Sequence, residues 1–102
     1  MLIRSQNKMS LVKFENIVVN INNINGKEII CWSQMNPGED EYISLGHYST
    51  KAKAMKVLDM IQEAYSEYQI MLNFSVSYLH EFKEKTDGFA IFQMPEDSEV
   101  EA

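Results

Sequence analysis

The chain has 102 residues, which is the length of one small domain and too short for two. Its content of 45% hydrophobic and 11% aromatic residues is ordinary for a folded protein and argues against wholesale disorder. The formal net charge of −6 disfavours general nucleic-acid binding and attachment to acidic membranes, because an acidic protein gains little from counterion release. The charge is unevenly spread: residues 1–58 are slightly basic, whereas residues 59–102 carry ten acids against two lysines.

Three further features indicate the compartment. Cys31 is the single cysteine, which excludes an intrachain disulfide and favours a reducing environment. The longest run without Asp, Glu, Lys or Arg covers residues 68–80, far fewer than the ~20 apolar residues of a membrane-spanning helix. The opening Met1–Arg4 does not have the pattern of a signal peptide. We therefore expect a cytoplasmic protein that does not bind membranes.

Short apolar runs separated by turn-forming residues fill the first half of the chain and predict antiparallel strands. The runs Leu2–Ser5 and Leu11–Phe14 are expected to pair as a hairpin. A break at residues 36–40, which include Pro and Gly, precedes another alternating run, Tyr42–His47. Together these segments predict a meander of four to five antiparallel strands.

Asn25-Gly26 is the clearest local turn signal in the chain. A type I′ turn needs positive φ at both central residues, and Asn-Gly meets this need at the lowest steric cost. Folding the chain about this turn places Val19 opposite Trp32 and puts Cys31 on the other face. The face that carries Trp32 is therefore the expected core face of the hairpin.

After Ser49-Thr50, whose hydroxyls suit a helix N-cap, the apolar period becomes helical. A first apolar stripe, expected to cover the sheet, consists of Ala54, Leu58, Ile61, Tyr65, Tyr68 and Leu72. A second, adjacent stripe consists of Val57, Met60, Ala64 and Met71. Two interpretations of the second stripe stay open: part of a wide core face, or an oligomer interface between helices.

A break in this long amphipathic helix is expected near Asn73. An unbroken helix to Lys85 would have about 36 residues and span ~54 Å, which is too long for a domain with a radius of gyration near ~13 Å. Residues 74–85 fit either helix or strand, and a second helix is slightly favoured. Phe89–Met94 predicts a short C-terminal strand. The expected result is a single α+β domain over residues 1–95, followed by a solvated acidic tail over residues 96–102.

The residue types that carry catalysis or bind metals are poorly placed in this sequence. Cys31, His47 and His80 are too widely spaced for a zinc site, so neither metal nor cofactor is expected. Cys31 lies within an apolar strand, where a thiol is usually buried and inert. The paired carboxylates fall in polar segments with nothing to desolvate them. We therefore expect that the protein is not an enzyme.

Three lysines cluster at the start of the predicted helix: Lys51, Lys53 and Lys56. Positive charge there opposes the helix dipole, so these lysines are not selected for helix stability. With Arg4 and Lys8 they would form a basic patch for a phosphate or an acidic partner. The alternative is that they are scattered lysines that only aid solubility.

Three segments are distinctive in combination: the opening MLIRSQ at Met1–Gln6, LGHYSTKAKAMKVLDMI at Leu45–Ile61, and FQMPEDSEVE at Phe92–Glu101. As a set they resemble a family of small uncharacterised proteins encoded by phages and mobile elements of Firmicutes. The resemblance implies an accessory gene, and such small acidic proteins often look like inhibitors of bacterial defence. It carries over no catalytic residue.

The polar residues of these segments include Arg4, Ser5, Gln6 and Gln93. They either contact a ligand or hold the first and last strands side by side. The expected function is a non-enzymatic binding protein that inhibits or sequesters a defence component, either a protein or a small nucleotide signal. The alternative is a small oligomeric structural or assembly protein without a ligand.

Overall fold

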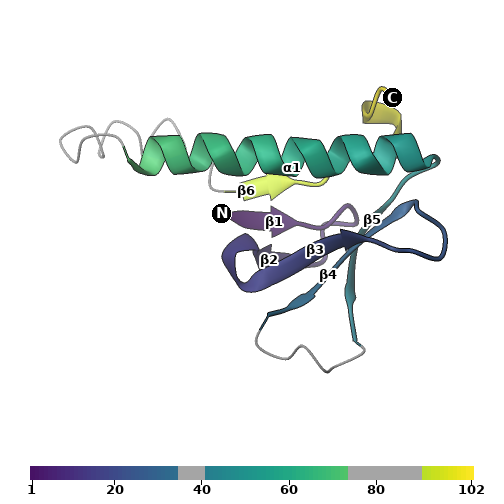
Figure 1. The fold of residues 1–102 in the computed structure, drawn as a ribbon, viewed down its shortest axis with the longest axis horizontal. Helices are drawn as coiled ribbons and strands as arrows, with labels where there is room; N and C mark the ends of the chain where they lie inside the picture. The colour runs from purple at the N-terminus through teal and green to yellow at the C-terminus, as the bar shows by residue number, and fades with distance from the viewer. Residues whose placement is uncertain (35–40, 74–90) are drawn as a thin grey trace.

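The computed structural model describes residues 1–34, 41–73 and 91–102. Six strands and one long helix follow one another in these residues (Figure 1). In chain order the elements are β1 (Leu2–Arg4), β2 (Leu11–Lys13), the 3-10 helix η1 (Phe14–Asn16), β3 (Ile17–Ile21), β4 (Glu28–Ser33), β5 (Ile43–His47), α1 (Lys51–Leu72), β6 (Ile91–Gln93) and the 3-10 helix η3 (Asp97–Glu99). The α+β class, the long helix and the C-terminal strand are thereby confirmed.

The strands form two three-stranded sheets rather than one continuous meander. Sheet A has the order β2-β1-β6, and sheet B has the order β3-β4-β5. β1 pairs with β2 as an antiparallel hairpin, as expected, but it also pairs in parallel with β6. This parallel pair joins the two ends of the chain, so the first and last strands lie side by side.

The core lies between the two sheets and α1, which runs alongside both (Figure 1). Each layer supplies side chains that are almost completely buried, such as Ile3 from β1, Ile29 and Cys31 from β4, and Ile61 from α1. The short sheets alone would be marginal, since a two- or three-stranded sheet needs a packed face to be stable. The helix therefore unites two small sheets into one core.

The β3–β4 register differs by one residue from the predicted register. Val19 pairs with Cys31, not with Trp32. Asn25 does not have positive φ; instead its Oδ1 accepts hydrogen bonds from the N–H groups of Lys27 (2.8 Å) and Glu28 (3.2 Å). The chain thus reverses through a longer turn than type I′, and a slip of one residue exchanges the two faces of a strand.

The predicted core face of the hairpin, the one that carries Trp32, is therefore wrong. Ile29 and Cys31 are completely buried, whereas Ile30 and Trp32 are only half-buried. A β-bulge then occurs where β4 meets β5, because Ile29 pairs with Gly46 but Ile30 pairs with Ser44. This bulge buries both Leu45 and Gly46 and breaks the simple alternation expected in that strand.

Helix α1 begins and ends where the sequence indicates. The Thr50 hydroxyl caps it by accepting from the Lys53 N–H at 3.1 Å, and Asn73 is the C-cap residue after Leu72. The break near Asn73 is thereby confirmed. The choice between helix and strand for residues 74–85 concerns residues outside those that the structure describes.

The sequence predicts a solvated tail over residues 96–102, but Val100 attaches this segment to the domain, whereas Glu101 and Ala102 are exposed. Val100 is only 4% exposed and belongs to the core, and η3 lies against the start of α1 (Figure 1). One apolar side chain among the acids thus provides an anchor that the composition of the tail obscures. Within the described residues no helix is both long and apolar enough to cross a lipid bilayer.

Candidate partner-binding groove

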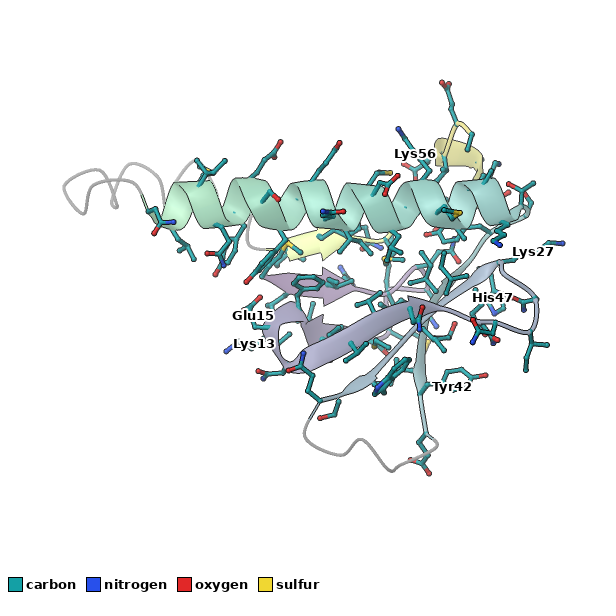
Figure 2. The ribbon with its side chains drawn as sticks, viewed as in Figure 1. Lys13, Glu15, Lys27, Tyr42, His47 and Lys56 are labelled. Atoms are coloured by element: carbon teal, nitrogen blue, oxygen red, sulfur yellow. The ribbon has the colours of Figure 1, made fainter. Side chains whose placement is uncertain are left out.

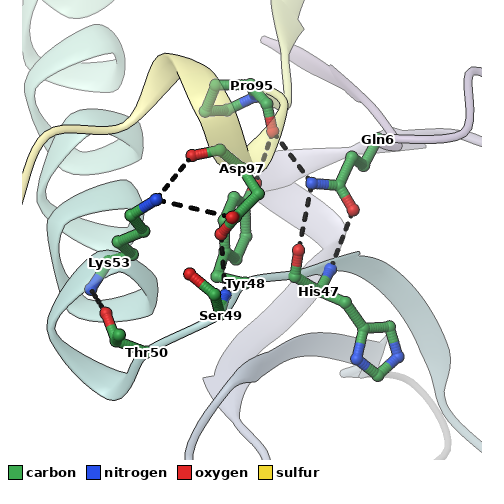
Figure 3. A network of polar contacts seen from close by, with 8 residues as sticks. All are labelled: Gln6, His47, Tyr48, Ser49, Thr50, Lys53, Pro95 and Asp97. Atoms are coloured by element: carbon green, nitrogen blue, oxygen red, sulfur yellow. Dashed lines mark hydrogen bonds and ion pairs between the residues drawn. The ribbon is translucent and has the colours of Figure 1, made fainter.

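The predicted basic patch at the start of α1 does not assemble. Lys53 Nζ donates to the carbonyl oxygen of Asp97 at 2.9 Å and lies 3.4 Å from its Oδ2 (Figure 3). A backbone hydrogen bond from Ser49 (2.7 Å) is the main cause that lowers the pKa of Asp97, with Lys53 assisting. Lys51 and Lys56 are exposed. Lys53 therefore connects the C-terminal segment to α1, and its ammonium group is already paired within the protein.

Gln6 joins three distant parts of the chain (Figure 3). Its Nε2 donates to the carbonyl oxygens of His47 and Pro95, both at 3.1 Å, and its Oε1 accepts from the His47 N–H at 2.9 Å. The buried Tyr48 hydroxyl donates to the same Pro95 oxygen at 2.9 Å. Gln6 therefore has the structural role that the sequence left open as one of two alternatives.

Ser5 and Gln93 also serve the fold. Ser5 is 1% exposed; its hydroxyl donates to Asn7 Oδ1 at 2.6 Å and accepts from the Ser10 N–H at 3.0 Å. Gln93 Nε2 donates to the Ser5 and Met94 carbonyl oxygens, both at 3.0 Å. These bonds close the β1–β2 turn and tie it to β6.

Arg4 and Lys8 are the predicted cationic residues that remain exposed outside α1. They line a shallow hollow of about 300 Å³ on the outer side of sheet A, together with Met9, Leu11 and Ile91. The lining of this hollow contains none of the helix lysines, and Lys56 projects from α1 on the side away from the sheets (Figure 2). The structure thus divides the predicted binding residues among separate places.

The second apolar stripe of α1 is not a continuous surface. Val57 is completely buried and Ala64 packs against the core, so these two residues belong to the core face. Met60 and Met71 are half-buried. The core face thus contains residues of both predicted stripes, which favours the interpretation of a wide core face, and the interpretation of the second stripe as an oligomer interface loses two of its four residues.

Of the residues considered for catalysis or metal binding, Cys31 is buried and His47 is paired, whereas His80 lies outside the residues that the structure describes. Cys31 is completely buried, and burial raises the pKa of its thiol to about 11. His47 Nε2 lies 2.9 Å from the Glu28 carboxylate. Burial opposes ionisation of Glu28, but hydrogen bonds from Asn22 and Ser44, with the His47 contact, lower its pKa overall. In residues 1–34, 41–73 and 91–102 no three His, Cys, Asp or Glu residues converge as metal ligands.

A half-open groove between α1 and β3 was not predicted from the sequence. It has a volume of about 440 Å³, within the range of ~300–1,000 Å³ typical of ligand sites. One wall comes from β3 and η1, and the other from α1. The lining residues are Phe14, Ile17, Val19, Leu58, Ile61, Gln62, Tyr65 and Ser66. The groove is thus mainly apolar, and its lining contains no charged residue.

Aromatic side chains hold part of this groove in shape. The rings of Phe14 and Tyr65 have centroids 4.7 Å apart and are tilted by 53°. The Tyr65 hydroxyl accepts a hydrogen bond from Gln69 Nε2 at 2.7 Å, and the ring of Tyr68 follows at 6.2 Å. Tilted aromatic pairs are favourable and restrict ring motion. The groove therefore has a wall that is formed before any partner arrives.

Negative charge lies beside the groove on α1. Asp59, Glu63 and Glu67 are exposed and spaced four residues apart, and Asp59–Leu72 contains no Lys or Arg. Like charges at this spacing weaken an isolated helix, so they are not placed there for helix stability. Asp59 and Glu63 stand three residues before Gln62 and Ser66 of the groove lining, so each is a neighbour of a lining residue on the helix surface. The helix side of the groove thus has an acidic rim.

The outer edge of β3 borders the other side of the groove. The Asn22 N–H donates to the Glu28 oxygen at 2.8 Å, and the Gln34 N–H donates to the Asn16 oxygen at 3.1 Å. Hydrogen bonding alternates along an antiparallel pair of strands. The backbone N–H and C=O groups of the even-numbered residues of β3 therefore bond to β4, whereas those of the odd-numbered residues point away from β4. Among the strands that the structure describes, β4 is the one neighbour of β3.

No protein-family model, curated protein or solved structure matches the chain. The structure itself describes the class of protein: a small α+β domain with an apolar groove beside an edge strand. The groove is the candidate functional site because it combines concavity, an apolar lining and a rim of one sign of charge.

Proposed function

We propose that the protein is a non-enzymatic binding protein that holds a segment of a protein partner in the groove between α1 and β3. The observation that carries this proposal is the groove itself, which is apolar, half-open and bordered by acids. Apolar side chains of the partner enter the groove, and basic side chains flank them to meet Asp59 and Glu63. The fully buried Cys31 thiol further supports a binding function over a catalytic one.

A protein segment fits this site better than a nucleotide does. Phosphate recognition needs cations or clustered N–H donors, and the groove lining has no Lys or Arg while its rim is acidic. The exposed cations outside α1 that remain from the predicted patch, Arg4 and Lys8, lie on sheet A. The nucleotide hypothesis therefore has weaker support than the protein hypothesis.

The resemblance to phage and mobile-element proteins extends this proposal to the biology. We propose that the partner is a component of bacterial defence and that occupation of one of its segments sequesters it. Net charge of −6 and an acidic helix rim favour a partner with a basic surface, such as the nucleic-acid-binding surface of a nuclease.

A selection from a displayed library of random twelve-residue peptides tests the proposed site. We expect enriched peptides to combine apolar and basic residues and to lose at least tenfold in affinity for the Leu58→Glu variant. The reason is that burying one aliphatic side chain is worth about 1.5–3 kcal/mol, and ~1.4 kcal/mol is tenfold. Binding is measured by fluorescence anisotropy of the labelled peptides.

Met55→Glu is the matched control, because it places the same charge on an exposed apolar residue of the same helix outside the groove. Ser66→Arg, at an exposed position of the groove lining, is a second groove variant that spares the core. We expect both groove variants, but not the control, to weaken binding. A selection without enrichment, or peptides that bind Leu58→Glu as tightly as Met55→Glu, would contradict the proposed function.

A further inference from the structure

The outer edge of β3 has backbone groups available for a further strand at Val19, whereas the Ile17 oxygen already accepts from Gln34 Nε2 at 3.4 Å. The Ile17 N–H donates to the Phe14 oxygen, and the Ile21 N–H donates to Asn20 Oδ1 at 2.9 Å. Val19 lies between them with its N–H and C=O directed away from β4. A residue of another strand opposite Val19 would find both a donor and an acceptor there.

We infer that the partner segment binds as an added β-strand on the outer edge of β3; this inference rests on the proposed function. Neighbouring strands lie ~4.8 Å apart, and residues directly opposite each other share a face of the sheet. Residues of the partner opposite Ile17, Val19 and Ile21 therefore direct their side chains to the face that α1 covers. Ile17 and Val19 line the groove on that face.

The composition of β3 supports this role. Natural edge strands are usually protected by a lysine, a proline or an inward charge, because unpaired edges invite other strands. β3 has the sequence IVVNI, with no charged residue and no proline, and Val18 on its outer face is 37% exposed. An edge without these protections is typical of a surface that accepts another strand.

The β3 edge and the groove then contact different parts of the partner. The β3 edge bonds to its backbone, which gives affinity without regard to sequence, and the groove selects its alternate side chains. The acidic rim formed by Asp59 and Glu63 selects basic residues beside these side chains. The expected ligand is an extended segment with apolar residues at every second position and Lys or Arg near its ends.

The test uses the tightest twelve-residue peptide from the selection, with single N-methyl groups placed along its backbone. In a bound strand, alternate N–H groups face β3, so we expect N-methylation to weaken binding at least tenfold at every second position of the central segment. Val19→Pro removes the outward N–H of β3 without removing a bond to β4, and proline is tolerated at such edge positions. We expect Val19→Pro to weaken binding at least tenfold.

Val19→Ala is the control, since it keeps the N–H, and thermal unfolding of both variants verifies that each is folded. The inference of an added strand is wrong if the N-methyl scan shows no two-residue period and Val19→Pro binds the peptide as tightly as Val19→Ala does. In that case loss of binding in Leu58→Glu still supports the groove. Undiminished binding in Leu58→Glu would instead contradict the proposed function, and the inference with it.

Discussion

Replacing Ile29 by alanine is expected to lower the free energy of unfolding by about 2–5 kcal/mol, the usual cost of removing a large aliphatic side chain from a packed core. Ile29 is completely buried in the core cluster, and it pairs with Ile21 of β3 and with Gly46 of β5. The measurement is urea unfolding followed by circular dichroism, with the slope of the transition checked for constancy.

Ile30→Ala is the matched control, because it removes the same atoms one residue further along β4. Ile30 is half-buried on the opposite face, so the expected loss is less than half as large. The pair distinguishes the observed register from the one that the Asn25-Gly26 turn predicted. A larger loss for Ile30→Ala than for Ile29→Ala would show that the Trp32 face is the core face after all.

Replacing Gln6 by alanine is expected to have the second large effect, lowering the free energy of unfolding by about 1–3 kcal/mol. The change removes three hydrogen bonds, each worth about 0.5–1.5 kcal/mol, and water recovers part of this loss because the site is half-exposed. It also loosens the contacts among the β1–β2 turn, the end of β5 and Pro95. Thermal and urea unfolding measure the effect.

Gln34→Ala provides the comparison, since the Gln34 side chain makes one long bond of 3.4 Å to the Ile17 oxygen. We expect it to cost less than about 0.5 kcal/mol. Equal destabilisation by the two variants would mean that the Gln6 network contributes nothing beyond an ordinary surface amide. Contact with a ligand would then be the better interpretation of Gln6.

Local signals in the sequence were sufficient for the elements themselves. Thr50 as a cap, the helical period after it and the break at Asn73 depend on neighbouring residues only. The same holds for the first hairpin, since the polar turn between β1 and β2 separates two apolar runs. These elements follow from backbone geometry and side-chain spacing, which a single sequence displays.

The arrangement of the elements depends on contacts between distant residues, and the sequence displays these poorly. The parallel pairing of β1 with β6 and the bonds of Gln6 to Pro95 span almost the whole chain. Val100 looks like part of an acidic tail, yet it is buried. The register of β3 and β4 depends on whether Asn25 adopts positive φ or accepts hydrogen bonds through its side chain. Composition does not decide between these two turns.

The groove is a special case of the same limitation. Its walls come from β3 and from α1, which are separated by about thirty residues, and its lining looks like ordinary core sequence. The one local sign was the unusual charge of α1, with Asp59, Glu63 and Glu67 on one stripe and no basic residue among them. That sign indicated where a partner would meet acids, but not that a groove lay beside them.

Amide hydrogen exchange at Val19, followed by NMR, tests the central claim most directly. In the free protein we expect the Val19 N–H to exchange at least tenfold faster than those of Val18 and Asn20, which face β4. Saturation with the selected peptide is expected to slow exchange at Val19 at least tenfold and leave its two neighbours nearly unchanged. A Val19 amide already protected in the free protein, or one that the bound peptide leaves unprotected, would contradict the claim that the β3 edge receives the partner.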